Sequence, residues 1–232
     1  MKYLNKDELR GDAECSQDAV KSSELLLRRL GELEAELTAG PDATARGKAL
    51  LDAAYILLDL ERLDEAYARA REAFELAIPR EDWEQAVQSC DVMSQTDATD
   101  AAKALAHGVW LGVTYPIDPE LSVAILQRLV EETPPKADGA AIAAAAARYV
   151  VDLRAEGKQR DDLVFFTGQL LGNVARQHSG VDSQELFDFW TERMQLNDPA
   201  LVLSRLAKIL DVLVPDGWWF DRDALRARLP VE

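Results

Sequence analysis

Apolar residues recur every three or four positions along most of this chain, and residues that end helices separate the runs. One stripe within residues 22–40 consists of Leu25, Leu26, Leu30, Leu33 and Leu37. This spacing predicts an amphipathic α-helix, whereas the strict alternation that is typical of strands is almost absent. Comparable runs recur up to residue 229, so we predict an all-α fold of about ten or eleven helices joined by short loops.

Helix-start signals mark several of these runs, above all in the second half of the chain. The expected N-cap residues are Asp118, Asp138, Asp182, Asp198 and Asp221. Asp118 and Asp198 each precede a proline, whose missing N–H costs nothing at the first helical position. Asp138 opens the alanine-rich segment 139–156, and Asp182 stands three positions before Glu185, as in a capping box.

Residues 161–180 are apolar most of the way around a predicted helix. The apolar residues are Leu163, Val164, Phe165, Phe166, Leu170, Leu171 and Val174. We therefore expect this helix to be the central, buried helix of the second half. Gly168 and Gly172 lie on one of its faces, and a glycine inside a helix costs roughly 1 kcal/mol relative to alanine. Tight packing against a neighbouring backbone is the expected compensation.

Residues 50–79 place small and large apolar residues at regular offsets in two predicted helices. Ala54 takes a small position of the first helix, Ala66 begins the second, and Pro79 closes it. This arrangement resembles a unit of the tetratricopeptide repeat (TPR) family. Its departures from the family pattern are Ala53 in place of leucine, Ala70 in place of an aromatic residue, and Pro79 one position late.

A second TPR-like unit could begin at 82–93, so the resemblance covers about residues 47–113. It implies antiparallel helical hairpins that stack either as a TPR-like α-solenoid or as a compact helical array. Stacked hairpins leave a concave groove. Proteins of the TPR family commonly bind peptides or partner proteins in that groove and carry out no catalysis, so the resemblance implies a protein-binding scaffold.

The expected organisation is a flexible N-terminus at 1–14 and a single helical domain at 15–232. An alternative divides this domain into TPR-like hairpins at 15–96 and a helical array at 97–232, with a capping helix at 221–229. The sequence Trp218, Trp219, Phe220 directly precedes that helix. These aromatic residues are either a ligand platform or a clamp, and the clamp is favoured because so short a helix must be anchored.

The charge of the chain narrows the classes of partner. It has 42 acidic and 26 basic residues, for a formal net charge of −16. Such a surface repels nucleic-acid phosphates and anionic lipids and attracts basic partners. The first residues lack the apolar core of a signal peptide, and no run has the roughly 18 apolar residues of a membrane span. We expect a cytoplasmic protein, and its frequent alanine and arginine are typical of GC-rich bacteria.

Common catalytic motifs are missing from the sequence. It contains no HExxH zinc motif, no GxxxxGK(S/T) or GxGxxG phosphate loop, and no GxSxG nucleophile turn. Cys15 and Cys90 are isolated, so they predict neither a disulfide framework nor a zinc site. We therefore assign no catalytic, cofactor-binding or metal-binding residue and predict a protein that is not an enzyme.

Four residues remain as candidates for a partner-binding site or pocket, namely His107, Trp110, Tyr115 and Phe189. His107 could be the titratable group of a small pocket with two aromatic walls. Alternatively, Trp110 belongs to the core of a helix that ends before Pro116, and this interpretation is favoured. Phe189 lies off the predicted core stripe of its helix, so it is expected to contact another helix or a partner.

Three functional hypotheses follow from these patterns. The leading one is a non-catalytic adaptor, scaffold or assembly chaperone that recognises another protein or a basic peptide segment. The alternative is a helical enzyme, or a small-molecule or metal-binding protein, with a site assembled from dispersed residues around His107 and Trp110. A third is a homo-oligomer that associates through the N-terminal leucine stripe at 25–37.

Overall fold

The fold is all-α, as predicted. The computed structural model describes residues 15–229, with side chains from residue 23 onward, and this part of the chain contains eleven α-helices and no strand. The helices are α1 (Cys15–Thr38), α2 (Ala43–Asp59), α3 (Leu63–Ala77), α4 (Trp83–Ser94), α5 (Ala101–Thr114), α6 (Pro119–Glu132), α7 (Asp138–Arg154), α8 (Gly157–Ser179), α9 (Gln184–Arg193), α10 (Pro199–Leu213) and α11 (Arg222–Arg226). A short 3₁₀ turn, η2 (Ile78–Arg80), follows α3. Among the described residues, no helix is long and apolar enough to cross a membrane.

The described residues form two compact units, 15–104 and 105–229, and the boundary falls within α5. The subdivision considered from the sequence placed this boundary at 96–97. The expected flexible segment 1–14 lies outside the described residues. Each unit has its own set of packed helices, and the two are described separately below.

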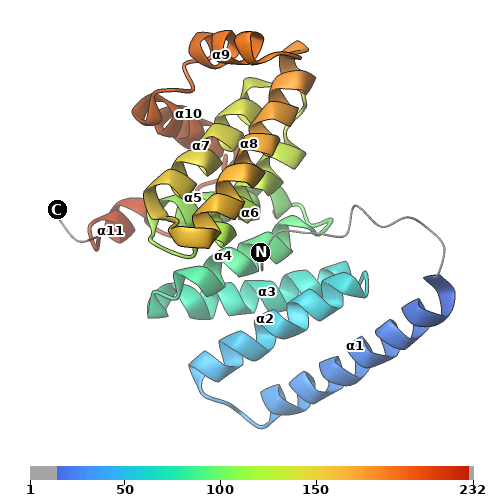
Figure 1. Cartoon of the computed structure of the whole chain (residues 1–232). Coiled ribbons are helices and arrows are strands. Elements are labelled where there is room, and N and C mark those ends of the chain that lie inside the picture. Colours follow the sequence, from blue (N-terminus) through green and yellow to red (C-terminus); the bar gives the residue numbers. More distant parts are fainter. Residues whose placement is uncertain (1–14, 230–232) are drawn as a thin grey trace. The chain divides into compact units, whose positions relative to one another are not determined.

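Consecutive helices pack side by side in the first unit (Figure 1). α2 and α3 form an antiparallel hairpin, and α4 packs against both of them. The hairpin contains a set of fully buried alanines, which are Ala53, Ala54, Ala66, Ala70, Ala73 and Ala77. Small side chains let the two helix backbones approach each other closely, which accounts for the alanines where the TPR pattern usually has larger residues.

The leucine stripe of α1 is divided between the core and the solvent. Leu30, Leu33 and Leu37 are buried, whereas Leu25 is 60% exposed and the neighbouring Leu27 is also exposed. Figure 1 shows α1 beside α2 at the edge of the unit, and α1 is the longer of the two helices, with 24 residues against 17. Only the C-terminal part of the stripe therefore packs within the unit.

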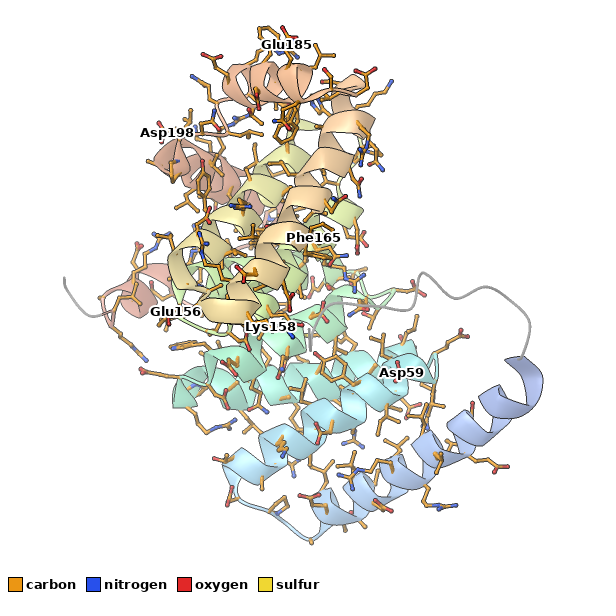
Figure 2. All side chains as sticks on the ribbon, in the orientation of Figure 1. Asp59, Glu156, Lys158, Phe165, Glu185 and Asp198 are labelled. Atoms are coloured by element: carbon orange, nitrogen blue, oxygen red, sulfur yellow. The ribbon has the colours of Figure 1, made fainter. Side chains whose placement is uncertain are left out.

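The central helix of the second unit is α7, and it packs against α6, α8 and α10. Its alanine run, 140–147, is buried throughout, including Ile142. The expectation that the helix at 161–180 would be central is wrong. α8 buries only Leu163, Thr167, Val174 and Ala175, and Phe165 is 70% exposed (Figure 2). The alanines of α7 let three neighbours approach it, whereas α8 has one face against α7 and another toward solvent.

The two glycines of α8 are likewise not explained by close packing. A Cβ atom built at Gly168 or Gly172 would meet no other atom within 4 Å outside the local helix backbone. The expected compensation for these glycines is therefore wrong, because no neighbouring helix covers their face.

Three of the five expected N-caps are confirmed. The carboxylate of Asp118 accepts a hydrogen bond from the Glu120 N–H at 2.8 Å, and Asp198 and Asp221 cap α10 and α11 in the same way. Two are wrong. Ala137 is the cap of α7, while Asp138 is the first helical residue and turns its side chain to α8 and α10. Ser183, one residue after Asp182, caps α9 with its hydroxyl.

Candidate functional site

His107 lies on α5 in the second unit and is fully buried. Its Nε2 atom accepts a hydrogen bond from the backbone N–H of Trp219 at 2.8 Å. Because a ring nitrogen that accepts a hydrogen bond carries no proton, the imidazole is neutral with its proton on Nδ1. The ring of Trp219 stacks on the imidazole at 4.3 Å, and the rings of Trp218 and Phe220 lie 4.7 and 5.1 Å from it.

Trp110 of α5 and Tyr115, the residue that directly follows this helix, extend the aromatic cluster. The Trp110 ring lies 5.3 Å from Phe220 and 6.2 Å from Tyr115. The hydroxyl of Tyr115 donates a buried hydrogen bond of 3.0 Å to the carbonyl of Leu225 in α11. Two arginines cover the cluster from α11, since the guanidinium carbon of Arg222 lies 4.2 Å from the Trp218 ring and that of Arg226 lies 5.5 Å from the Trp110 ring.

We call residues 218–220 the aromatic clamp, because they join α11 to α5 through these contacts. The structure thus brings three of the four candidate residues together, and His107, Trp110 and Tyr115 are all buried under the clamp and α11. This arrangement matches the interpretation in which Trp110 belongs to the core. The aromatic walls around His107 are supplied by the chain itself.

Polar contacts around a second histidine, His178 of α8, and Asp138 of α7 link four helices. Its Nε2 atom lies 3.2 Å from a carboxylate oxygen of Asp138 in α7, and the indole N–H of Trp190 in α9 donates to its Nδ1 at 3.4 Å. Nδ1 also lies 2.7 Å from the Ser179 hydroxyl. Arg205 of α10 reaches the other Asp138 oxygen at 3.5 Å. These contacts join residues from different helices, so no local motif in the sequence indicates them.

Phe189, the fourth candidate residue, lies away from the aromatic clamp, on α9. It is 61% exposed, and Leu186, one turn earlier, is 48% exposed. The two residues border a shallow groove of about 170 Å³ whose other lining residues are Ser179, Val181, Trp190 and Arg193. We call this the Phe189 groove. Its walls are mostly apolar, and one cation stands among them.

A larger cleft of about 540 Å³ lies on the other side of α9, and we call it the α9 cleft. Its principal lining residues are Arg148 and Tyr149 of α7, Leu171 of α8, and Phe187, Asp188 and Glu192 of α9. Sequence reasoning did not find this site, because its residues come from three helices and none forms a local motif. A tyrosine next to an arginine at the end of an alanine run was the single signal in the sequence.

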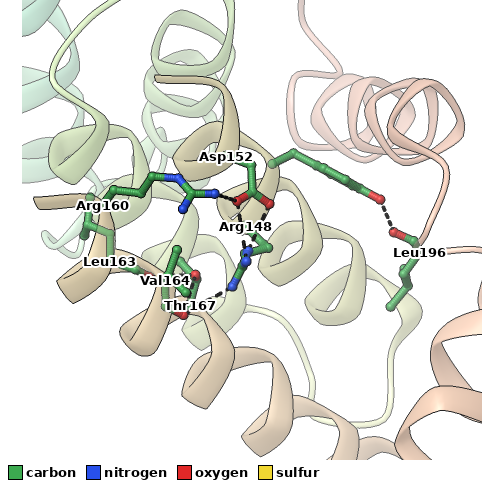
Figure 3. A network of polar contacts seen from close by, with 8 residues as sticks. Arg148, Asp152, Arg160, Leu163, Val164, Thr167 and Leu196 are labelled. Carbon is green, nitrogen blue, oxygen red and sulfur yellow. Dashed lines mark hydrogen bonds and ion pairs between the residues drawn. The ribbon is translucent and has the colours of Figure 1, made fainter. Parts of the chain in front are cut away.

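Two side chains of α7 that line the cleft are held by hydrogen bonds. The Tyr149 hydroxyl donates a hydrogen bond to the carbonyl of Leu196, and burial raises the pKa of this phenol, as do Asp198 and Asp152. Arg148 donates to Asp152 at 3.0 Å and to the carbonyl of Val164 at 3.4 Å (Figure 3). These hydrogen bonds orient both side chains.

Comparisons with other proteins add no assignment: no protein-family model, no curated protein and no solved structure matches this chain. Within the described residues, no group of three or more His, Cys, Asp or Glu side chains is placed to hold a metal ion. The geometry of the two hollows beside α9 is therefore the basis for the functional proposal.

Proposed function

We propose that this protein is a non-catalytic adaptor, scaffold or assembly chaperone that binds a basic, amphipathic segment of another protein. One observation carries the proposal, namely the exposed apolar surface of α9 beside the Phe189 groove. Phe189 and Leu186 stand one helical turn apart on this surface. An apolar pair at this spacing is suited to the apolar face of a partner helix.

The charge around this apolar pair favours a basic partner. α9 carries three carboxylates, Glu185, Asp188 and Glu192, against the single cation Arg193. The whole chain has a formal net charge of −16. Because opposite charges steer association and like charges suppress it, a segment with lysine or arginine beside its apolar residues fits this surface better than an acidic one.

The first unit supports the same class of function. α2, α3 and α4 pack in succession, and the TPR-like pattern lies on these helices. The resemblance to TPR proteins implies that stacked hairpins of this kind present a surface for protein partners. This part of the proposal rests on the sequence pattern together with the order of helix packing.

The proposal predicts a specific effect at Phe189. We expect a fluorescent helical peptide with leucines on one face and lysines and arginines on the other to bind, with an affinity that falls as salt rises. The F189A variant should weaken binding by about tenfold, because a large apolar contact is lost. Fluorescence anisotropy measures both effects.

The matched control is F165A, which removes an equally exposed phenylalanine from α8, away from the groove. It should leave the affinity unchanged. Equal binding of a peptide in which glutamate replaces the basic residues would contradict the proposal. So would equal losses in F189A and F165A, because binding would then be non-specific.

We also propose self-association through α1 as a second function, which is favoured by the exposure of Leu25 and Leu27. A second copy of α1 would cover these leucines. Light scattering of the wild-type chain over a range of concentrations should then give a mass above that of the monomer, and a double change of Leu25→Ser and Leu27→Ser should restore the monomer. A wild-type chain that stays monomeric at high concentration excludes this proposal.

A further inference from the structure

We infer that the α9 cleft is a receptor for a single arginine side chain of the partner segment. The inference rests on the proposed function and names the residue type that the partner must supply. It follows from four features of the cleft. These are its size, its apolar and aromatic floor, the carboxylates on one wall, and the hydrogen bonds that its own cation, Arg148, already makes within the protein.

The size and floor of the cleft suit a long side chain with an apolar stem. Its volume of about 540 Å³ lies within the range of ligand sites in proteins, roughly 300–1,000 Å³. Leu171 and Phe187 supply apolar surface, and Tyr149 supplies an aromatic ring. The methylene groups of an arginine can cover such surface while the charged end remains at the rim.

The wall formed by α9 supplies two negative charges for the charged end. Asp188 and Glu192 are four residues apart, so they lie on the same face of α9 and both line the cleft. The Gln184 amide donates to Asp188 at 2.7 Å, which leaves the carboxylate charge in place. Among the described residues, Glu192 forms no ion pair.

The one cation that lines the cleft, Arg148, already has hydrogen-bond acceptors of its own. Arg148 is directed to its own helix neighbour Asp152 and to the backbone of α8, and Arg160 approaches the same Asp152 at 3.1 Å (Figure 3). The guanidinium of Arg148 therefore already has its acceptors. Asp198 adds a further negative charge near Tyr149. The charges that remain for a ligand are the carboxylates of Asp188 and Glu192.

The aromatic ring of Tyr149 favours arginine over lysine. Its hydroxyl is held by the carbonyl of Leu196, so the orientation of the ring is set in advance. A planar guanidinium can stack on such a ring and bond a carboxylate with two parallel N–H groups, whereas an ammonium presents a single point charge. The cleft therefore offers both an aromatic ring for stacking and carboxylates for paired hydrogen bonds, and a guanidinium can make both contacts.

The experiment uses the basic amphipathic peptide described above with one arginine, and versions with lysine or citrulline at that position. Citrulline has the shape of arginine without its charge. The full-length protein should bind the arginine peptide about tenfold more tightly than the citrulline peptide. In E192Q this difference should shrink to within about twofold, because one carboxylate partner is lost. The control E185Q changes a carboxylate of α9 that does not line the cleft, and it should keep the full difference.

Each result decides between the inference and the proposed function. Equal preference for arginine in E192Q and wild type overturns the inference, while binding of the peptide still supports the adaptor. Equal losses in E192Q and E185Q also overturn it, because the net charge alone would then govern binding. If no peptide binds, the proposed function fails, and the inference fails with it. Titration with arginine amide, followed by NMR, then shows whether the cleft accepts a free small cation instead.

Discussion

Deletion of residues 215–232 is expected to lower the unfolding temperature of the second unit by on the order of 10 °C. The deletion removes the aromatic clamp and α11, and it exposes the rings of His107, Trp110 and Tyr115, which are buried in the intact chain. Loss of a buried aromatic side chain alone costs about 3–5 kcal/mol. The clamp residues are half-buried, so we expect about 4 kcal/mol for the whole segment, which corresponds to the stated change in temperature.

Circular dichroism measures the unfolding temperature, and hydrogen exchange locates the effect. Faster exchange is expected in α5, since His107 would lose the hydrogen bond that it accepts from Trp219. W219A should give a smaller decrease, because its backbone N–H still reaches His107. F165A is again the control, since the side chain is exposed and lies outside the clamp. Unchanged stability together with lost peptide binding would instead make residues 218–220 a ligand platform.

The aromatic clamp shows how far the sequence alone leads. An aspartate N-cap at Asp221 and a short helix that needs an anchor predict that the preceding tryptophans dock onto the core, and they do lie against α5. The sequence does not reveal which residue receives them. His107 and Trp219 are more than a hundred positions apart, and only the fold brings the imidazole to the Trp219 N–H. Helix caps can be recognised in a sequence because they depend on neighbouring residues. The surface of α5 against which the clamp packs cannot be recognised in this way.

The error about α8 has a physical cause of the same kind. Its apolar residues occur on nearly every face, which predicts burial when the sequence is considered alone. Burial depends on how many neighbours surround a helix, and α7 takes the central place because its alanines admit three neighbouring helices. Phe165 is then left exposed. Apolar content predicts that a helix packs somewhere, whereas the number of its neighbours is a property of the whole fold.

The same contrast between local sequence pattern and overall packing applies to the candidate site. Phe189 was predicted from its place off the core stripe of one helix, and its exposure agrees with that local pattern. The α9 cleft could not be predicted, because Tyr149, Leu171 and Glu192 belong to three helices. The presence of each residue can be explained within its own helix, without reference to a site. What they share is a hollow, which appears only after the helices are packed.

Replacement of Arg154 by alanine is expected to destabilise the second unit by about 3 kcal/mol. Arg154 ends α7, and its guanidinium donates to the carbonyl of Gly112 at 2.8 Å and to the carbonyl of Val113, in the last turn of α5. Burial lowers the pKa of Arg154, yet arginine remains charged and suits the negative end of the α5 dipole. Without the guanidinium, these carbonyls lose their cationic donor in a partly buried place.

Urea denaturation measures this effect, and two variants serve as controls. R154K should recover only part of the stability, because one ammonium cannot reproduce the paired donors of a guanidinium. R176A removes an exposed arginine that bonds Asn173 on its own helix, and it should change the free energy of unfolding by less than about 0.5 kcal/mol. A R154A variant as stable as the wild type would mean that water replaces the guanidinium at both carbonyls.

Arg154 and the aromatic clamp hold the same helix through different contacts, so a variant that lacks both is informative. Arg154 holds the end of α5 to α7, whereas Trp219 and Leu225 hold His107 and Tyr115 of the same segment. If α5 becomes disordered once either contact is removed, R154A will cost less in the truncated chain than in the intact one. Strictly additive effects would instead show that α5 stays packed on α7 without its clamp.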